Sequence, residues 1–284
     1  MRFKRGKKNK ALLINLKNNR EELKLDTNYL ENNYLTLVGK VTSEKKFSHE
    51  IYGERFYSFD LLVPRLSGAA DVIPVTASER LYTEDMLKIG TKLTIKGQFR
   101  SYNSYENNKN KLILTVFAKD IQIFDEEEKL KDGFIENREG SEENGDEETA
   151  KNNYILKNYT TNEVVLIGYI CKKPVYRQTP FGREIADLLL AVNRSYNKSD
   201  YIPSIAWGRT AKFCQNLDVG TEVKIVGRVQ SRNYEKKLED GSIVTKVAYE
   251  VSIGSLEVIR EFGKGEEQEN ENNDETSSDV QEAM

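Results

Sequence analysis

The sequence is poor in the side chains that catalysis and metal binding most often require. Its 284 residues include one histidine, His49, and two cysteines, Cys171 and Cys214. Their spacing fits neither a metal-ligand cluster nor a disulfide framework, and we expect both cysteines to be small buried residues. No glycine-rich phosphate loop and no nucleophile paired with a base is present. We therefore expect no enzymatic activity, no catalytic residue, no metal and no cofactor.

Long hydrophobic runs are also absent. The longest, residues 11–14 and 188–192, are far shorter than the roughly 20 apolar residues that cross a bilayer. The basic residues 1–8 are not followed by an apolar stretch of signal-peptide length. The sequence therefore predicts no membrane segment and no secretion signal, and cysteines outside any framework favour the reducing cytoplasm.

Net charge is small over the whole chain, at −3, because charges of opposite sign are segregated. Residues 1–28, 29–124 and 154–260 carry net charges of +6, +2 and +5, whereas residues 125–153 and 261–284 carry −8 each. We interpret 1–28 as a basic arm, 125–153 as an acidic linker and 261–284 as a disordered acidic tail. The segments 29–124 and 154–260 are then two basic domains, a pattern that does not exclude a polyanionic partner.

The two domains are copies of one unit. A constant shift of 129 residues gives twelve identities without a gap over residues 33–80, a density that chance periodicity does not explain. The matched pairs include Asn33 with Asn162, Gly39 with Gly168, Gly53 with Gly182, Arg65 with Arg194, Asp71 with Asp200 and Arg80 with Arg209.

Both copies consist of β-branched and aromatic runs that glycine, asparagine and serine interrupt. In the second copy we expect three strands, a short helix and two strands over 162–177, 183–193, 201–206, 209–217, 222–232 and 243–259. Five short strands with one helix between the third and fourth describe an OB-fold, a partly open Greek-key barrel that takes up oligonucleotides. The predicted fold is therefore all-β, with two OB-folds in one chain.

Over residues 162–259 the sequence resembles the bacterial single-stranded DNA-binding (SSB) family in the order and spacing of its motifs. They are NEVVLIG at 162–168, PVYRQTPFG at 174–182, LAVNRSY at 190–196, YIPSIAWG at 201–208 and VGRVQSRNY at 226–234. The first copy, 33–124, resembles the family weakly, mainly through its similarity to the second.

The resemblance implies a set of DNA-binding residues. The family stacks bases on four aromatic positions of each OB-fold, here Tyr196 after the second strand, Tyr201 and Trp207 at the ends of the third, and Tyr234 in the loop between the last two. Each ring is expected to contribute about 1–3 kcal/mol per base, whatever the base. The nearest cations, expected to contact phosphates and make affinity salt-dependent, are Arg194, Lys198, Arg209, Arg228, Arg232, Lys236 and Lys237.

The first copy provides an internal comparison. At the positions of the first three rings it has Ser67, Val72 and Ser78, so an OB-fold is expected to form without them. We therefore interpret the three rings as binding residues rather than core. The fourth position keeps a ring, Tyr105, which joins the DNA-binding set, but the first OB-fold is expected to bind weakly and mainly to support assembly or another partner. Three pairs that are apolar in both copies are assigned to the core or barrel wall: Phe47 with Tyr176, Phe59 with Leu188 and Leu61 with Leu190.

The resemblance implies a protein that coats single-stranded DNA in replication, recombination or repair, in the cytoplasm and associated with the nucleoid. SSB proteins present four OB-folds, so a chain with two implies a homodimer. Residues 277–284 lack the apolar Pro-Phe tip with which the family docks replication and repair proteins. One alternative is an accessory protein of a replisome, primosome or mobile element that binds DNA or RNA. Another is a protein-interaction adaptor, which has no use for four rings beside cations.

Overall fold

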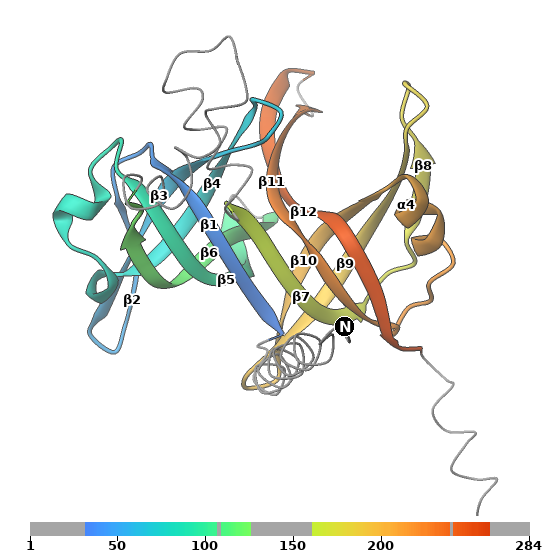
Figure 1. Cartoon of the computed structure of the whole chain (residues 1–284), viewed down its shortest axis with the longest axis horizontal. Helices are drawn as coiled ribbons and strands as arrows, with labels where there is room; N and C mark the ends of the chain where they lie inside the picture. Colours follow the sequence, from blue (N-terminus) through green and yellow to red (C-terminus); the bar gives the residue numbers. More distant parts are fainter. Residues whose placement is uncertain (1–31, 107–108, 126–160, 239–240, 262–284) are drawn as a thin grey trace, which may run out of the picture. The chain divides into compact units, whose positions relative to one another are not determined.

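The structure is a computed structural model that describes residues 32–106, 109–125, 161–238 and 241–261 (Figure 1). The predicted basic arm at 1–28 lies outside these residues. So do the predicted acidic linker at 125–153 and acidic tail at 261–284, except for residues 125 and 261 themselves.

The described elements follow the duplication. The first copy contains β1 (Asn33–Val41), β2 (Lys46–Ile51), β3 (Glu54–Pro64), β4 (Ala70–Ser78), two 3-10 helices (Glu79–Leu81 and Glu84–Leu87), β5 (Lys92–Glu106) and β6 (Lys109–Ile123). The second contains β7 (Asn162–Ile170), β8 (Val175–Gln178), β9 (Glu184–Arg194), β10 (Lys198–Trp207), α4 (Gly208–Cys214), β11 (Glu222–Lys237) and β12 (Ile243–Arg260).

Each copy closes into a barrel. In the first, β1 pairs with both β3 and β5, and the parallel pair β4–β6 completes the ring. In the second, β7 pairs with both β9 and β11, and β10–β12 is the matching parallel pair. The prediction of two OB-folds is confirmed. In the first copy, however, 3-10 turns take the place of the helix.

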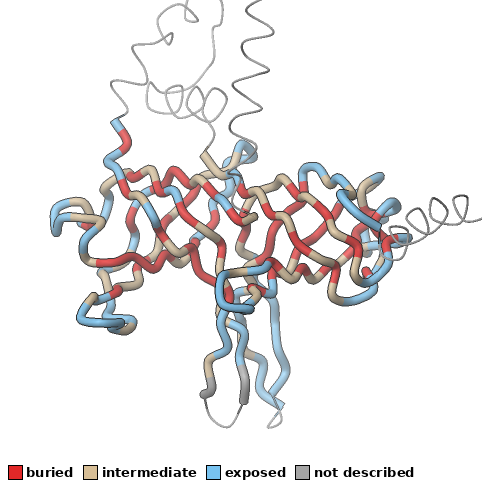
Figure 2. The backbone as a smooth tube through the Cα atoms, turned by 90° about the horizontal axis from the view of Figure 1, so that it is seen from below, coloured by how far each residue is buried: buried red, intermediate tan, exposed pale blue. Residues whose placement is uncertain are grey.

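Four predicted elements differ from the structure by three residues or more. The strand predicted over 201–206 begins at Lys198. The strand expected over 162–177 is two strands, β7 and β8, separated by residues that include Pro174, which cannot donate to a β-ladder. The helix α4 ends at Cys214, three residues before the predicted end. The pair β11–β12 extends to Lys237 and Ile243, so Tyr234 lies within a strand and not in the predicted loop. Figure 2 shows long exposed hairpins, in pale blue, that project from the region where buried residues are concentrated.

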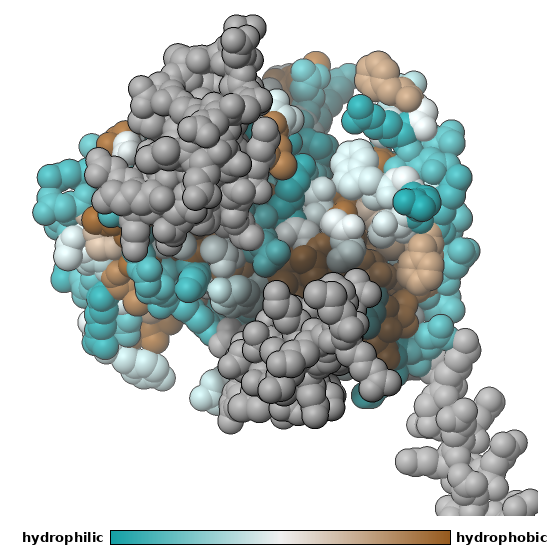
Figure 3. All heavy atoms as spheres, viewed as in Figure 1, coloured by the Kyte–Doolittle hydropathy of each residue, from teal (hydrophilic) through white to brown (hydrophobic). Residues whose placement is uncertain are grey.

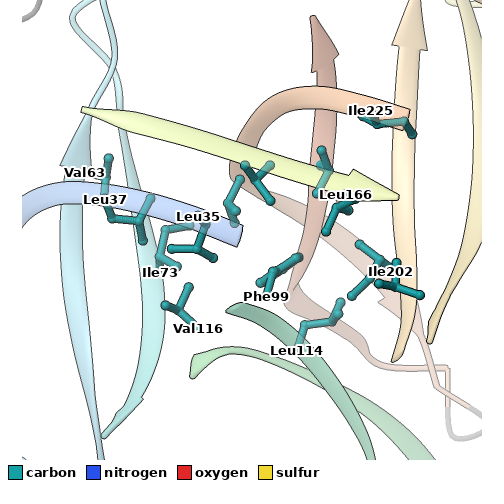
Figure 4. Packing of buried hydrophobic residues seen from close by; sticks show 14 of the residues in the cluster. Leu35, Leu37, Val63, Ile73, Phe99, Leu114, Val116, Leu166, Ile202 and Ile225 are labelled. Carbon is teal, nitrogen blue, oxygen red and sulfur yellow. The ribbon is translucent and has the colours of Figure 1, made fainter. Parts of the chain in front are cut away.

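A continuous hydrophobic core fills both barrels. Leu35 and Phe99 of the first barrel and Leu166 and Ile202 of the second have no exposed surface. Figure 4 shows these side chains close to one another, with strands of both barrels around them. Their positions follow from strand alternation, because every second side chain of a half-buried strand points to the same face.

The predicted core residues are buried with one exception. Phe59, Leu61, Leu188 and Leu190 are buried, and Tyr176 packs against the core. The prediction for Phe47 was wrong, because its side chain is 60% exposed and meets Tyr57 edge-on, with ring centroids 6.0 Å apart. The pairing of β2 with β3 shifts register just after Phe47. Such a bulge changes which side of a strand faces the barrel, and it left no signal in the sequence.

The two barrels share one sheet. Strands β1 and β7 pair antiparallel between the barrels, with Leu35 opposite Val164 (Figure 1). Since these two residues are themselves a matched pair of the 129-residue repeat, the strands meet about a local twofold axis. Within the second barrel, Gly168 allows β7 to approach β9 closely, since an added Cβ would lie 2.6 Å from the carbonyl oxygen of Ala191.

Two buried aspartates, a matched pair of the repeat, join the barrels across this axis. Asp71 of the first barrel accepts a hydrogen bond from the amide of Ser231 at 2.6 Å, and Asp200 of the second accepts one from the amide of Ser101 at 2.7 Å. Neither aspartate has exposed surface. We call these contacts the junction; they explain the aspartates that the two copies share.

Candidate nucleic-acid interface

Strand alternation gives the second barrel an outer face. On β10 the side chains of Ile202 and Ala206 point into the core, so Tyr201 and Trp207 point outwards. The pairing of Ile205 with Ser252 and of Ser252 with Arg228 carries the same face onto β12 and β11. The outer face is defined here by the outward residues of β9, β10, β11 and β12.

Trp207 is fixed on this face. It is the last residue of β10, lies opposite Ile185 of β9, and its Nε1 donates a hydrogen bond to Ser252 Oγ at 3.1 Å. Ile185 is 2% exposed although it is not part of the core cluster, so it is buried on the outside of the barrel. The indole remains 39% exposed, which leaves surface for a ligand.

Tyr196 and Tyr201 lie towards the other end of the same strand pair. Tyr201 pairs with Ala191 and is 46% exposed. Tyr196 lies in the turn between β9 and β10, as predicted, with φ of 62° and 94% of its side chain exposed. A left-handed backbone is strained for a bulky residue, and such strain is concentrated at functional sites.

Tyr234 lies on the extended part of β11, 39% exposed and opposite Lys246 of β12. It has the same strand parity as Arg228 and Arg232, so it belongs to the outer face. Sequence reasoning did not select Lys246. Its position within a β-rich segment gave no signal, and only the register places it beside the ring.

The predicted cations fall into two groups. Arg194 Nε lies 3.3 Å from Asp200, Arg228 Nη1 lies 3.7 Å from Asp71, and Arg232 Nε lies 3.6 Å from Glu250. The other four are exposed and have no ion pair with any described residue: Lys198, Arg209, Lys236 and Lys237. Arg194 and Arg228 thus belong to the junction, whereas the exposed four are open to a polyanion.

The outer face also carries a nearly buried carboxylate that the sequence did not reveal. Glu250 is 7% exposed and accepts a hydrogen bond from Gln230 Nε2 at 2.8 Å. Glu250 pairs with Gln230, which is two residues from Arg232 on β11 and so points to the same outer face. The charge of Arg232 is therefore partly balanced within the protein.

The first barrel covers its outer face differently. His49 stacks on Phe56 with ring centroids 4.7 Å apart and an interplanar angle of 5°, and Phe56 lies 5.6 Å from Phe117. The guanidinium of Arg100 lies over Phe117, 4.1 Å from its centroid. These four side chains form a closed row in which the rings contact one another and the end ring is covered by a cation.

The row replaces Trp207. The parallel pairs Val75–Val116 and Ser204–Val251 align Phe117 with Ser252, the residue that binds the indole in the second barrel. Ser78 stands at the Trp207 position, as the sequence showed. Tyr105 lies on β5, but its side chain is outside what the structure describes.

The ionisable groups of the second barrel include three whose pKa is shifted by burial. Burial raises the pKa of Cys214 to about 11 and also raises the pKa of Cys171. Burial and the nearby charge of Arg65 lower the pKa of Arg228. Within the described ranges no group of three or more His, Cys, Asp or Glu residues is arranged to hold a metal ion. No described helix is long and apolar enough to cross a membrane.

The surface as a whole mixes polar and apolar groups. Figure 3 shows one face, on which hydrophilic residues make up most of the described surface and hydrophobic residues emerge among them in small groups. Rings interleaved with cations suit a ligand that offers both flat apolar groups and negative charge.

Comparison with known proteins gives one family. The model of the "Single-strand binding protein family" matches residues 161–259. Single-stranded DNA-binding protein A of Bacillus subtilis (strain 168) is 37% identical over 119 residues, which are 39% of this chain and 69% of the relative. The single-stranded DNA-binding protein of Caldanaerobacter subterraneus subsp. tengcongensis is 33% identical over 117 residues, 39% of this chain and 77% of the relative.

A solved structure extends the likeness in fold to both barrels. The wild-type single-stranded DNA-binding protein from Thermus aquaticus superposes with a TM-score of 0.57 at 18% identity, covering 80% of this chain and 93% of that chain. At this identity the match supports the fold alone.

Proposed function

Because the chain belongs to the single-strand binding protein family, we propose that it binds single-stranded DNA without sequence preference. The observation that supports the site is the set of exposed rings on the second barrel. Tyr201, Trp207 and Tyr234 lie on its outer face, and Tyr196 lies in the adjoining turn. Every base offers a π-face, so stacking on these rings holds a strand of any sequence.

The cations have unequal roles in this proposal. Lys198, Arg209, Lys236 and Lys237 contact phosphates, because they are exposed and have no ionic partner among the described residues. Release of counterions from those phosphates makes the affinity fall with rising salt. Arg194 and Arg228 act mainly by holding the junction that positions the outer face.

The two OB-folds are proposed to divide the work. On the first barrel, Phe56 is 8% exposed between His49 and Phe117, and Arg100 covers the end of the row. A base gains little from rings whose faces are already occupied. We therefore expect the first barrel to bind DNA weakly and to contribute mainly to assembly or to another partner.

Assembly and cellular role are inferred from the family. A homodimer would present four OB-folds, and the protein would act in the cytoplasm at the nucleoid, without catalysis, during replication, recombination or repair. Partner proteins in those pathways are part of the proposal.

The test is a titration of the full chain with oligo-dT, followed by the fluorescence of Trp207, the only tryptophan. Stacking of a base on the indole is expected to quench the emission strongly. Trp207→Ala lacks this signal, so its binding is followed by the anisotropy of a fluorescent oligo-dT and should weaken about 5- to 150-fold, the equivalent of about 1–3 kcal/mol. Phe213→Ala, at an exposed position on α4, is the control and should bind as the unsubstituted chain does. Unchanged emission at saturating oligonucleotide would instead favour an adaptor.

A further inference from the structure

The turn between β8 and β9 carries an exposed ring. Phe181 is 92% exposed and makes no ring contact with any described residue. The matched turn of the first barrel carries Tyr52, which is fully exposed and has a left-handed φ of 51°. Tyr52 and Phe181 occupy the same position of the repeat, and each is followed by a glycine with a left-handed φ.

The turn that carries Phe181 is held in one conformation. The amide of Gly182 donates to the carbonyl of Thr179 at 2.8 Å, and the amide of Thr179 donates to the carbonyl of Arg183 at 2.8 Å. The amide of Arg183 also donates to Thr179 Oγ1 at 3.1 Å. A ring on a preorganised turn loses little conformational freedom when it meets a ligand.

The register places this ring beyond one end of the proposed stacking track, which consists of Tyr196, Tyr201 and Trp207. Tyr201 pairs with Ala191 and Trp207 with Ile185, so these two rings are about 20 Å apart along the strands. Phe181 lies four residues before Ile185 in the sequence, so its Cα is at most about 13 Å from that of Ile185, on the side away from Tyr201. It therefore lies beyond Trp207, where a strand that leaves the indole would pass.

The charge beside the ring favours a polyanion over another protein. Arg183 is exposed and has no ion pair with any described residue. Arg177 of β8 lies opposite Ile185, on the side of β9 away from Trp207, and pairs with Asp187 at 2.8 Å. In the sequence, Phe181 is preceded by Thr179 and Pro180 and followed by Gly182.

We propose that Phe181 is a further base-stacking residue, which extends the DNA track of the second barrel past Trp207 over the β8–β9 turn. This inference rests on the proposed function and adds a ligand contact at a position outside the four aromatic positions of the family. Arg183 is the accompanying phosphate contact.

The experiment uses the full chain with Phe181→Ala, Phe181→Tyr, Tyr52→Ala and Trp207→Ala, titrated with fluorescent oligo-dT of increasing length. Phe181→Ala should weaken binding of long oligonucleotides about 5- to 150-fold and leave the shortest ones that still bind unaffected. Phe181→Tyr keeps the π-face and should bind normally. Tyr52→Ala should also bind normally, because the first barrel has Ser78 at the Trp207 position and so has no stacking ring next to that turn. The slope of affinity against salt should not change in Phe181→Ala.

Several results overturn the inference. Phe181→Ala that binds every length normally, or Phe181→Tyr that binds as weakly as Phe181→Ala, removes the stacking role. A change in mass by light scattering in Phe181→Ala assigns the tip to contacts between copies. If Trp207→Ala weakens binding while Phe181→Ala does not, only the inference fails; if the unsubstituted chain does not bind oligo-dT, the proposed function fails.

Discussion

The junction allows a matched test of how two equivalent carboxylates stabilise the protein. Asp71 accepts hydrogen bonds from Arg65 Nε at 2.6 Å, from Arg65 Nη2 and from the amide of Ser231. Asp200 accepts one from the amide of Ser101, whereas Arg194 Nε lies 3.3 Å from its other oxygen without forming a hydrogen bond. The duplication thus gives the same residue two environments.

The pKa values of the two groups are displaced in opposite directions. Burial alone would raise the pKa of Asp71, but the hydrogen bonds from Arg65 and Ser231 outweigh it and hold that pKa below its ordinary value. For Asp200, burial raises the pKa, and the contacts from Ser101 and Arg194 offset it only in part. The charged form is therefore favoured by the fold at Asp71 and disfavoured at Asp200.

We expect Asp71→Asn to destabilise the protein by about 2–3 kcal/mol. Breaking a buried ion pair costs about 3–5 kcal/mol, and the partial exposure of Arg65 reduces that figure. Asp200→Asn keeps an oxygen for the amide of Ser101 and loses one contact that is not a hydrogen bond, so its cost should be about 0–1 kcal/mol.

The measurement is urea unfolding at neutral pH, followed by circular dichroism and by the emission of Trp207. Lowering the pH through the depressed pKa of Asp71 should remove the advantage of the unsubstituted chain over Asp71→Asn, because its carboxylate then becomes protonated. The contribution of Asp200 has the opposite sign and should improve as the pH falls through its raised pKa towards its ordinary value. Equal losses in the two variants, or a larger loss in Asp200→Asn, would refute this reasoning.

Two further predictions concern the outer face. Glu250→Gln keeps an acceptor for Gln230 but removes the charge beside Arg232, so it should tighten oligo-dT binding about 2- to 5-fold at low salt; fluorescence anisotropy measures this, and weaker binding would contradict it. Lys236→Ala should reduce the slope of log affinity against log salt by about 1. Arg228→Ala should leave that slope nearly unchanged, since Asp71 already holds this cation, and an equal reduction in both variants would assign Arg228 to a phosphate.

Much of the fold was predictable because it is repeated. Shared residues such as Asn33 and Asn162 serve the same purpose in both barrels: each side chain bonds the backbone of a neighbouring strand, Asn33 at Phe99 and Asn162 at Val229. Strand ends were less predictable. The extension of β11 past Arg232 depends on pairing with β12. It could not be predicted from alternating burial, because residues 232–237 are all exposed.

The candidate site was predictable where it depends on residue identity and not where it depends on register. The exposure of Tyr196, Tyr201, Trp207 and Tyr234 agrees with their choice from the sequence as binding residues, but their use in binding remains a prediction. The pairing of the cations was hidden. Arg194 lies beside Asp200, six positions away on the paired strand, and Asp200 also contacts the other barrel through the amide of Ser101.

Matching the two copies position by position did not reveal which side chains cover the outer face of the first barrel. The first copy has Ser78 where the second has Trp207, but Phe117, on a different strand, occupies the place next to it. In each barrel the outward side of the β4–β6 or β10–β12 pair is covered, so that Thr76 and Thr115 of the first barrel and Ile205 and Ser252 of the second are nearly buried. One barrel covers it with a row of side chains that bind one another, and the other with an indole that stays open. The same packing requirement, met by different strands, is therefore what separates a closed face from one available to DNA.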